Sequence, residues 1–222
     1  MVSTDQIWEL DLRQEICQAG SRLYLKNFLA SCDGNISYRI SDDRILITPS
    51  GVSKGFLQAE DLAVVDLKGK VLEGRPSSEI KMHLAVFRKC PKARAVVHAH
   101  PPHAIAWTVG RPDLKTLPSE CLSEVILATG EIPIVPYARP GTEEMGSHLE
   151  PFLPSRRALI LSRHGALTWG ESLSEAVNGM ERVDHSAQIL WLASQLGPLT
   201  PLPEAEVQHL RKMREQIGEK LL

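Results

Sequence analysis

The sequence predicts one α/β or α+β domain in which helices cover a mostly antiparallel sheet. Three observations indicate this class. Two pairs of short apolar segments in the first third of the chain are separated by turn residues, as in hairpins. Single strand-to-helix steps follow these hairpins. The 222 residues also match the length of one domain with one sizeable core.

The amino-terminal elements are expected to be a helix followed by two hairpins. Residues 4–30 carry apolar side chains at helical spacing, and Asp33-Gly34 ends that pattern. The strands are expected at 35–40 and 44–48, around the turn Ser41-Asp42-Asp43, and at 63–67 and 71–72, around Lys68-Gly69-Lys70.

The middle of the chain alternates helical segments with short apolar runs. Two serines precede residues 79–89, whose apolar side chains fall on one helical face, so a helix is expected there. The remaining segments are predicted as strands at 93–99, 132–135, 158–161 and 167–169, and as helices at 103–109 and 142–149.

The carboxyl-terminal part is expected to contain two helices. Residues 173–196 form the longer one, capped by Ser172 or Ser174. The tail at about 203–221 is amphipathic through Val207, Leu210, Met213 and Ile217. Residues 197–203 are the only linker-like stretch, so residues 1–222 are interpreted as a single domain.

Charge and cysteine content restrict the class of protein. The net charge of -2, from 25 basic and 27 acidic residues, argues against a general binder of nucleic acid or anionic membranes. The four cysteines, at positions 17, 32, 90 and 121, form no CxxC motif, which favours a reduced intracellular chain. The first twelve residues lack an apolar targeting core, so a cytoplasmic protein is expected.

Three histidines stand at the ends of predicted strands. His98 and His100 are two residues apart at the end of an apolar strand, so their side chains share one face. His164 follows another apolar strand and precedes Gly165. Three imidazoles leave one position of a tetrahedral site open, as in catalytic rather than structural zinc sites. The alternative is that the strand histidines are simply hydrogen-bonded.

Glu79 is the candidate catalytic carboxylate. It begins a predicted helix directly after Ser77 and Ser78, where the helix dipole stabilises a negative charge. If that end of the helix faces the metal, Glu79 is the general base or a ligand that the substrate displaces. The alternative is an ordinary acidic residue in a first helical turn.

Three loops offer donors for a phosphate group. They are Gly34-Asn35, Ser50-Gly51 and Ser77-Ser78, which carry backbone N–H groups, hydroxyls or an amide, and the last also opens a helix. Each loop by itself is equally consistent with a turn or a cap. Neither GxxxxGK[ST] nor GxGxxG occurs, which argues against a nucleotide site.

Taken together, these motifs resemble one known family, the class II aldolase/adducin family, over residues 10–195, and most closely its L-fuculose-1-phosphate aldolases. The motifs, which occur in the family's order, are Gly34-Asn35-Ile36-Ser37-Tyr38-Arg39, Thr48-Pro49-Ser50-Gly51, Pro76-Ser77-Ser78-Glu79, His98-Ala99-His100 and Arg163-His164-Gly165, with Pro136-Tyr137-Ala138 and Gly141-Thr142. The resemblance implies a three-layer α/β/α sandwich and a homotetramer with sites at subunit interfaces.

The resemblance also implies a cofactor and a set of site residues. The cofactor is Zn²⁺, for which Mn²⁺ or Co²⁺ can substitute in such a donor set. The residues implied to hold the metal are His98, His100, His164 and Glu79, and those implied to hold the substrate phosphate are Gly34, Asn35, Ser50, Gly51, Ser77 and Ser78.

The activity implied is reversible cleavage of a ketose 1-phosphate to dihydroxyacetone phosphate and an aldehyde. It proceeds through a zinc-stabilised enediolate with Glu79 as the acid and base. The family's fuculose aldolases have a tyrosine near the position of Leu122 and another in the tail, both of which help to place the aldehyde half. This chain has no tyrosine after Tyr137, so L-fuculose 1-phosphate and a 5-deoxy- or methylthio-pentulose 1-phosphate are equally open as substrates.

Two other functions remain as alternatives. One is a dehydratase similar to methylthioribulose-1-phosphate dehydratase, which keeps the carbon chain whole. The other is a non-catalytic interaction domain similar to the adducin heads. Those heads have lost metal ligands, whereas His98, His100, His164 and Glu79 are all present here.

Overall fold

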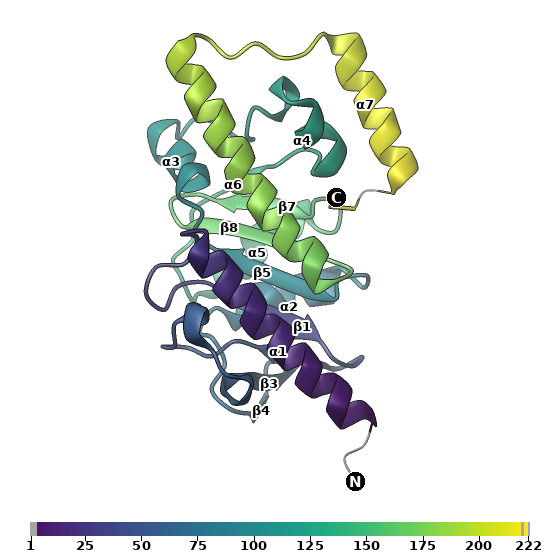
Figure 1. The fold of residues 1–222 in the computed structure, drawn as a ribbon. Helices are drawn as coiled ribbons and strands as arrows, with labels where there is room; N and C mark the ends of the chain where they lie inside the picture. Colours follow the sequence, from purple (N-terminus) through teal and green to yellow (C-terminus); the bar gives the residue numbers. More distant parts are fainter. Residues whose placement is uncertain (1–3, 219, 222) are drawn as a thin grey trace.

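The computed structural model describes residues 4–218 and 220–221. Its strands form one eight-stranded sheet in the order β4-β3-β2-β1-β5-β8-β7-β6 (Figure 1). The strands are β1 (Asn35–Arg39), β2 (Arg44–Ile47), β3 (Ala63–Asp66), β4 (Val71–Glu73), β5 (Ala95–Ala99), β6 (Ile134–Val135), β7 (Ala158–Leu161) and β8 (Gly165–Gly170). The α-helices are α1 (Thr4–Leu25), α2 (Ile80–Lys89), α3 (Pro102–Gly110), α4 (Ser123–Ala128), α5 (Glu143–Leu149), α6 (Leu173–Leu196) and α7 (Glu204–Ile217).

Antiparallel pairing dominates the sheet, as the sequence predicts. β1 pairs with β2 and β3 with β4 as the two expected hairpins. Only β6 and β7 run parallel among the described strands. β5 lies at the centre, between β1 and β8, and joins the amino-terminal half of the sheet to the carboxyl-terminal half.

Helices cover both faces of the sheet and give the expected three layers. On one face, Ile16 of α1 and Met180 of α6 lie in a buried cluster with Val97 of β5. On the other face, Phe87 of α2 lies in a second cluster with Val96. Because neighbouring strand residues point to opposite faces, Val96 and Val97 connect the two layers to the same strand. Figure 1 shows α1 and α6 in front of the sheet, with α2 and α5 behind it.

The first helix ends earlier than the sequence predicts, at Leu25 rather than near residue 30. Asn27 adopts a left-handed backbone conformation, with φ of 61°. The N–H of Phe28 bonds the Leu23 carbonyl at 3.0 Å, and that of Asn27 bonds the Tyr24 carbonyl at 2.9 Å. This is a Schellman motif, which ends the helix and turns the chain.

The tail helix forms as expected, and its buried residues are Val207, Leu210 and Arg214. Val207 and Leu210 of α7 pack against Ile126 of α4, whereas Met213 and Ile217 are exposed. Residues 197–203 carry the chain across from α6 to α7 (Figure 1). The single domain over residues 1–222 stays a prediction.

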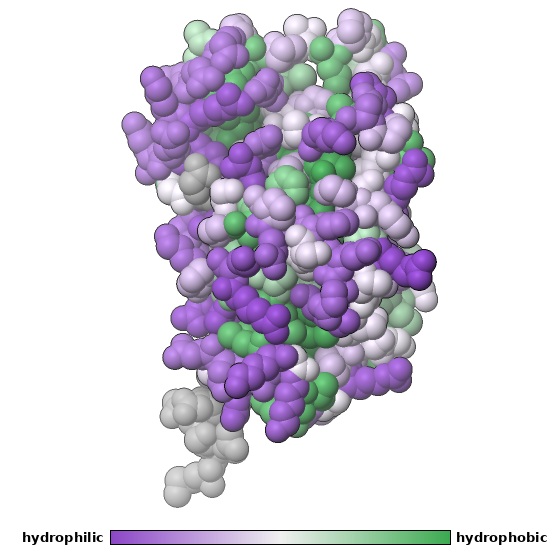
Figure 2. Space-filling view, turned by 180° about the vertical axis from the view of Figure 1, so that it is seen from behind, coloured by the Kyte–Doolittle hydropathy of each residue, from purple (hydrophilic) through white to green (hydrophobic). Residues whose placement is uncertain are grey.

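Hydrophilic side chains cover most of the face opposite to that of Figure 1, and hydrophobic ones occur there in separate areas (Figure 2). Within the part of the chain that the structure describes, no helix combines the length and the hydrophobicity needed to cross a membrane.

Candidate metal centre

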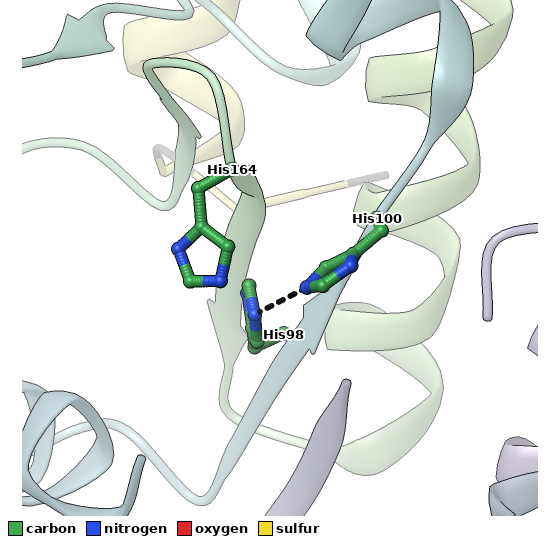
Figure 3. Close-up of side chains that lie close together, drawn as sticks. All are labelled: His98, His100 and His164. Carbon is green, nitrogen blue, oxygen red and sulfur yellow. Dashed lines mark hydrogen bonds between the residues drawn. The ribbon is translucent and has the colours of Figure 1, made fainter. Parts of the chain in front are cut away.

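Three histidines converge at the centre of the sheet. His98 is on β5, His100 follows the end of that strand, and His164 lies in the tight turn between β7 and β8. β8 pairs with β5, with Ala166 opposite Ala99, so the turn reaches the end of β5. The three ring centroids stand 4.8 to 5.0 Å apart, and Figure 3 shows the rings facing one another. The spacing of the predicted ligands is therefore that of a single small site.

Because Gly165 has no side chain, the turn between β7 and β8 can lie close to His98 and His100. A Cβ atom at this position would lie 2.9 Å from both His98 Cε1 and His100 Cδ2, and closer still to the Ala99 carbonyl oxygen. Arg163, two residues earlier, has a φ of 58° and donates its backbone N–H to Thr108 Oγ1 at 2.8 Å. Any side chain at position 165 would therefore push into the histidine cluster.

The hydrogen bonds of the rings leave lone pairs facing one another. His98 Nδ1 lies 2.9 Å from the Ala166 carbonyl oxygen, which can only accept, so Nδ1 carries the proton. His100 Nδ1 lies 3.3 Å from Asp33 Oδ2, which sets the same tautomer. Burial lowers the pKa of His98 to about 3, so this ring is neutral. The two Nε2 atoms are then unprotonated and only 3.2 Å apart.

Such an arrangement fits a shared cation. Two nitrogens bound tetrahedrally to zinc at about 2.0–2.1 Å stand about 3.3 Å apart, close to the separation seen here. The Nδ1 atoms are anchored by a carbonyl and a carboxylate, the usual partners of metal-binding imidazoles. Ligand atoms of all three histidines lie within 4.8 Å of one another. The donor set therefore fits the predicted zinc.

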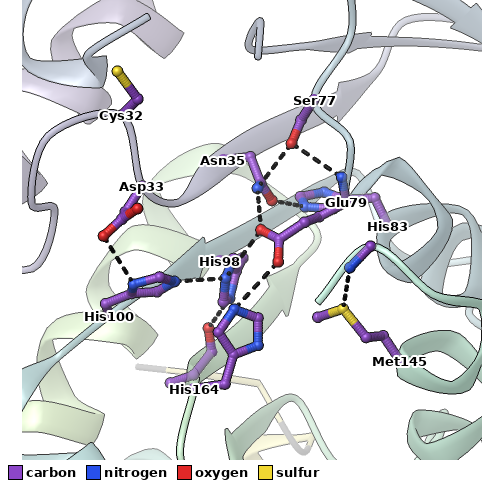
Figure 4. A network of polar contacts seen from close by, with 12 residues as sticks. Cys32, Asp33, Asn35, Ser77, Glu79, His83, His98, His100, Met145 and His164 are labelled. Atoms are coloured by element: carbon purple, nitrogen blue, oxygen red, sulfur yellow. Dashed lines mark hydrogen bonds and ion pairs between the residues drawn. The ribbon is translucent and has the colours of Figure 1, made fainter. Parts of the chain in front are cut away.

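Glu79 lies beside this cluster, as the sequence predicts. It is the residue directly before α2, and its Oε2 is 3.4 Å from His98 Nε2 while its Oε1 is 3.2 Å from His164 Nε2. Burial alone raises the pKa of this carboxyl, but the hydrogen bonds from His164 and Asn35 and the nearby imidazoles lower it far below its usual range. Glu79 is therefore ionised and faces the same point as the histidines (Figure 4).

The three predicted phosphate loops lie side by side. The loop after β2 bonds the one before α2, because Ser77 N donates to the Thr48 carbonyl at 3.1 Å. It also bonds the start of β1, since Ile36 N donates to Thr48 Oγ1 at 3.1 Å. Asn35 Nδ2 donates to Ser77 Oγ at 3.0 Å and closes the set. The three loops therefore lie together where these strands end, next to Glu79.

One residue of each loop keeps an unused backbone donor. Within the described chain, no hydrogen-bond acceptor is found for the N–H groups of Gly34, Gly51 and Ser78. Gly34 and Gly51 have φ values of 68° and 76°, the left-handed region that favours glycine. Groups of free backbone N–H donors are suited to an anion. Phosphate binding by these loops stays a prediction.

Two buried polar residues at the site were not predicted from the sequence. His83 contacts Asn35 and Ser37, and it lies one helical turn after Glu79 on the same face of α2, a spacing that could have indicated it. Lys54 is only 2% exposed and donates to the carbonyls of Cys32 and Val52 at 2.6 and 2.8 Å. No sequence signal indicates Lys54, because lysine is rarely buried.

A large hollow of the described structure lies away from these residues. It measures about 1300 Å³ and is bordered by α3, α6 and the tail, with Trp107, Trp191 and Arg211 in its wall. None of the predicted site residues lines it. The functional site is therefore identified here by its chemistry and not by its size.

Comparison with known proteins identifies the family. Residues 14–191 match the family described as "Class II Aldolase and Adducin N-terminal domain". The chain belongs to this family. The resemblance inferred from the motifs is thereby confirmed, and so is the fold that it implied.

Relatives with different activities have similar identities to this chain. The 3-oxo-tetronate 4-phosphate decarboxylase of Escherichia coli K12 is 32% identical over 91% of this chain and 96% of its own. The L-fuculose phosphate aldolase of Methanococcus vannielii is 34% identical over 81% of this chain and 95% of its own. The crystal structure of YgbL from Escherichia coli, described as a putative aldolase/epimerase/decarboxylase, superposes with a TM-score of 0.84 at 31% identity, over 91% and 99% of the two chains.

Proposed function

We propose that this protein is a metal-dependent lyase that breaks a carbon–carbon bond next to the carbonyl group of a phosphorylated sugar or sugar acid. The observation that carries this proposal is the placement of an ionised Glu79 between three convergent imidazoles and three loops with free N–H donors. One end of such a substrate is an anion and the other carries oxygens that a cation binds. The site offers a partner to each end.

The roles of the residues follow from their positions. The backbone N–H groups of Gly34, Gly51 and Ser78 bind and orient the phosphate. A divalent cation held by His98, His100 and His164, Zn²⁺ by preference, supplies an electron sink for the charge left when the carbon–carbon bond breaks. Glu79 takes up a proton from water at Oε1 or Oε2 and delivers it to the substrate carbon from which the other fragment has departed.

Among lyase reactions we favour decarboxylation of a 3-oxo sugar-acid phosphate. In aldol cleavage the departing fragment is an aldehyde. The hydroxyl on the substrate carbon that becomes the aldehyde must lose a proton, so a second proton-handling group is needed. In decarboxylation the departing fragment is CO₂, which needs no such group. The family's fuculose aldolases have tyrosines near the position of Leu122 and in the tail, which help to place the aldehyde half. This chain has Leu122 and no tyrosine after Tyr137, so it lacks those groups. The similarity to the decarboxylase supports the same choice.

Cleavage of a ketose 1-phosphate, the reaction predicted from the sequence, is the second candidate. It is favoured by the similarity to the archaeal L-fuculose phosphate aldolase. The two reactions share a product. Protonation of the carbon that loses CO₂ from a 3-oxo-tetronate 4-phosphate gives dihydroxyacetone phosphate, which aldol cleavage also releases. Release of this compound therefore does not separate the two activities.

The deciding experiment measures both fragments. The purified protein is incubated with 3-oxo-tetronate 4-phosphate and, separately, with L-fuculose 1-phosphate, before and after removal of metal with a chelator. Chelator-sensitive CO₂ release from the first substrate supports the decarboxylase, and aldehyde release from the second supports the aldolase. Loss of water with an intact carbon chain would identify a dehydratase. No turnover by a protein that takes up no metal would favour an interaction domain.

Assembly as a homotetramer stays a proposal that rests on the family. Light scattering of the purified protein tests it, because a tetramer has four times the 24.6 kDa of one chain. Residence in the cytoplasm is likewise proposed, and fractionation of cells that express the protein tests it.

A further inference from the structure

A buried row of hydrogen bonds lies behind Glu79, on the side away from the three histidines. It runs from Ser37 on β1 to His83 on α2, then to Asn35, and ends at Glu79. Figure 4 shows its last three members, His83, Asn35 and Glu79. Both Ser37 and His83 are 0% exposed. The function proposed above uses Glu79 but assigns no role to His83.

The partners of Asn35 determine which way its amide faces. Asn35 Nδ2 donates to Glu79 Oε2 at 2.8 Å and to Ser77 Oγ at 3.0 Å, which uses both of its hydrogens. Its Oδ1 therefore faces His83 Nε2. Rotating the amide by half a turn would place an oxygen against the carboxylate, where the two would repel each other.

The same contacts determine the tautomer of His83. Because Asn35 Oδ1 can only accept, His83 Nε2 must carry a proton. The other ring nitrogen, Nδ1, lies 2.6 Å from Ser37 Oγ and accepts the hydroxyl proton. Burial lowers the pKa of His83 to about 4, which agrees with a neutral ring. The donor and the acceptor of each hydrogen bond between Ser37 and Glu79 are thus defined.

We propose that His83 is a positioning residue that fixes the amide of Asn35 and, through it, the Oε2 oxygen of Glu79. This inference rests on the proposed function of Glu79. The row does not act as a proton wire, because it ends at Ser37 in the interior and reaches no solvent. Its effect is geometric: it holds a carboxylate oxygen in one place next to His98.

Kinetics of paired variants test this role. His83→Leu removes the donor, whereas His83→Gln places an amide N–H at about the reach of Nε2. We expect His83→Leu to lower kcat by about 10-fold to 100-fold, the range for partners that orient site groups, with KM and bound metal unchanged. His83→Gln should restore most of the rate. An unchanged kcat in a folded His83→Leu protein would overturn the proposal.

A double-variant cycle tests whether His83 acts through Asn35. If it does, His83→Leu has no further effect on kcat in a protein that already carries Asn35→Ala. An additional loss of 10-fold or more in the double variant would mean that His83 acts by another route, and the proposal would fail.

A measurement without turnover separates this inference from the proposed function. Nitrogen-15 NMR of the histidine rings reports which nitrogen of His83 carries the proton, in the wild-type protein and without substrate. A protonated Nε2 and an unprotonated Nδ1 support the arrangement, whatever reaction the enzyme catalyses. The opposite tautomer would overturn it, even if Glu79 proves essential. A wild-type rate for Glu79→Gln would instead remove the proposed role of the carboxylate.

Discussion

Replacing Gly165 with alanine should weaken metal binding without a change in any ligand. The added Cβ would lie 2.9 Å from carbon atoms of both the His98 and His100 rings. Carbon atoms make ordinary contacts from about 3.5 Å, so each ring would have to retreat by about 0.6 Å. Metal–ligand distances tolerate only about 0.2 Å. The variant should therefore bind the metal about 10-fold to 100-fold more weakly.

The backbone makes this substitution costly as well. The new Cβ would approach the Ala99 carbonyl oxygen more closely than either ring, and a strand in the centre of the sheet moves little. Overpacking of this kind lowers the free energy of unfolding by about 1–3 kcal/mol. Gly165 does not have a left-handed φ, so the steric contact is the only expected source of the loss.

The assay compares Gly165→Ala with Gly110→Ala. Gly110 ends α3, and a Cβ there would meet no heavy atom within 4 Å. Metal content by mass spectrometry, competition with a chelator and the melting temperature are measured for both. Equal metal affinity and equal melting temperature in the two variants would refute the reasoning.

Three further outcomes are expected. Glu79→Gln should lower kcat by about 10²–10⁴-fold with little change in KM, as measured by steady-state kinetics, because it removes a proton-transfer group. The pKa of His83 falls from 6.5 to about 4 on folding, so the unfolded state binds an extra proton between these pH values. The free energy of unfolding should therefore fall as the pH drops through this window, by roughly 3 kcal/mol in all. Urea unfolding at pH 7 and pH 4.5 measures this fall, which should be smaller for His83→Gln than for the wild-type protein. Lys54→Met leaves two backbone carbonyls without their donor and should lower the free energy of unfolding by about 1–3 kcal/mol, against no change for the exposed Lys212→Met.

The fold was predictable wherever local signals agreed with tertiary pairing. The long helix at residues 173–196 has the predicted bounds, because Ser172 caps its start and Gly197 follows its end. The strand predicted at residues 132–135 is shorter, since the Ile132 carbonyl accepts from Leu117 N in a neighbouring loop and only Ile134 and Val135 join the sheet. Helix α4 was missed because it is six residues long and no side chain caps its start.

The candidate site was predictable only in part, because its geometry depends on pairing between distant segments of the chain. The alternation of a strand places His98 and His100 on one face from spacing alone. Their distance from His164 depends on the pairing of β5 with β8, which no local pattern specifies. Neither the amide orientation of Asn35 nor the burial of Lys54 has a local signature, because both depend on loops that meet only in the folded chain.

The central place of β5 has a consequence for biosynthesis. His98 and His100 leave the ribosome well before His164, which is made only after β7 is complete. A nascent or truncated chain that ends before β8 therefore offers two imidazoles, and its β5 lacks one of its neighbours. The third ligand and the closing strand arrive together. A chain that ends before His164 therefore lacks one of the three converging imidazoles as well as the strand that brings it next to β5.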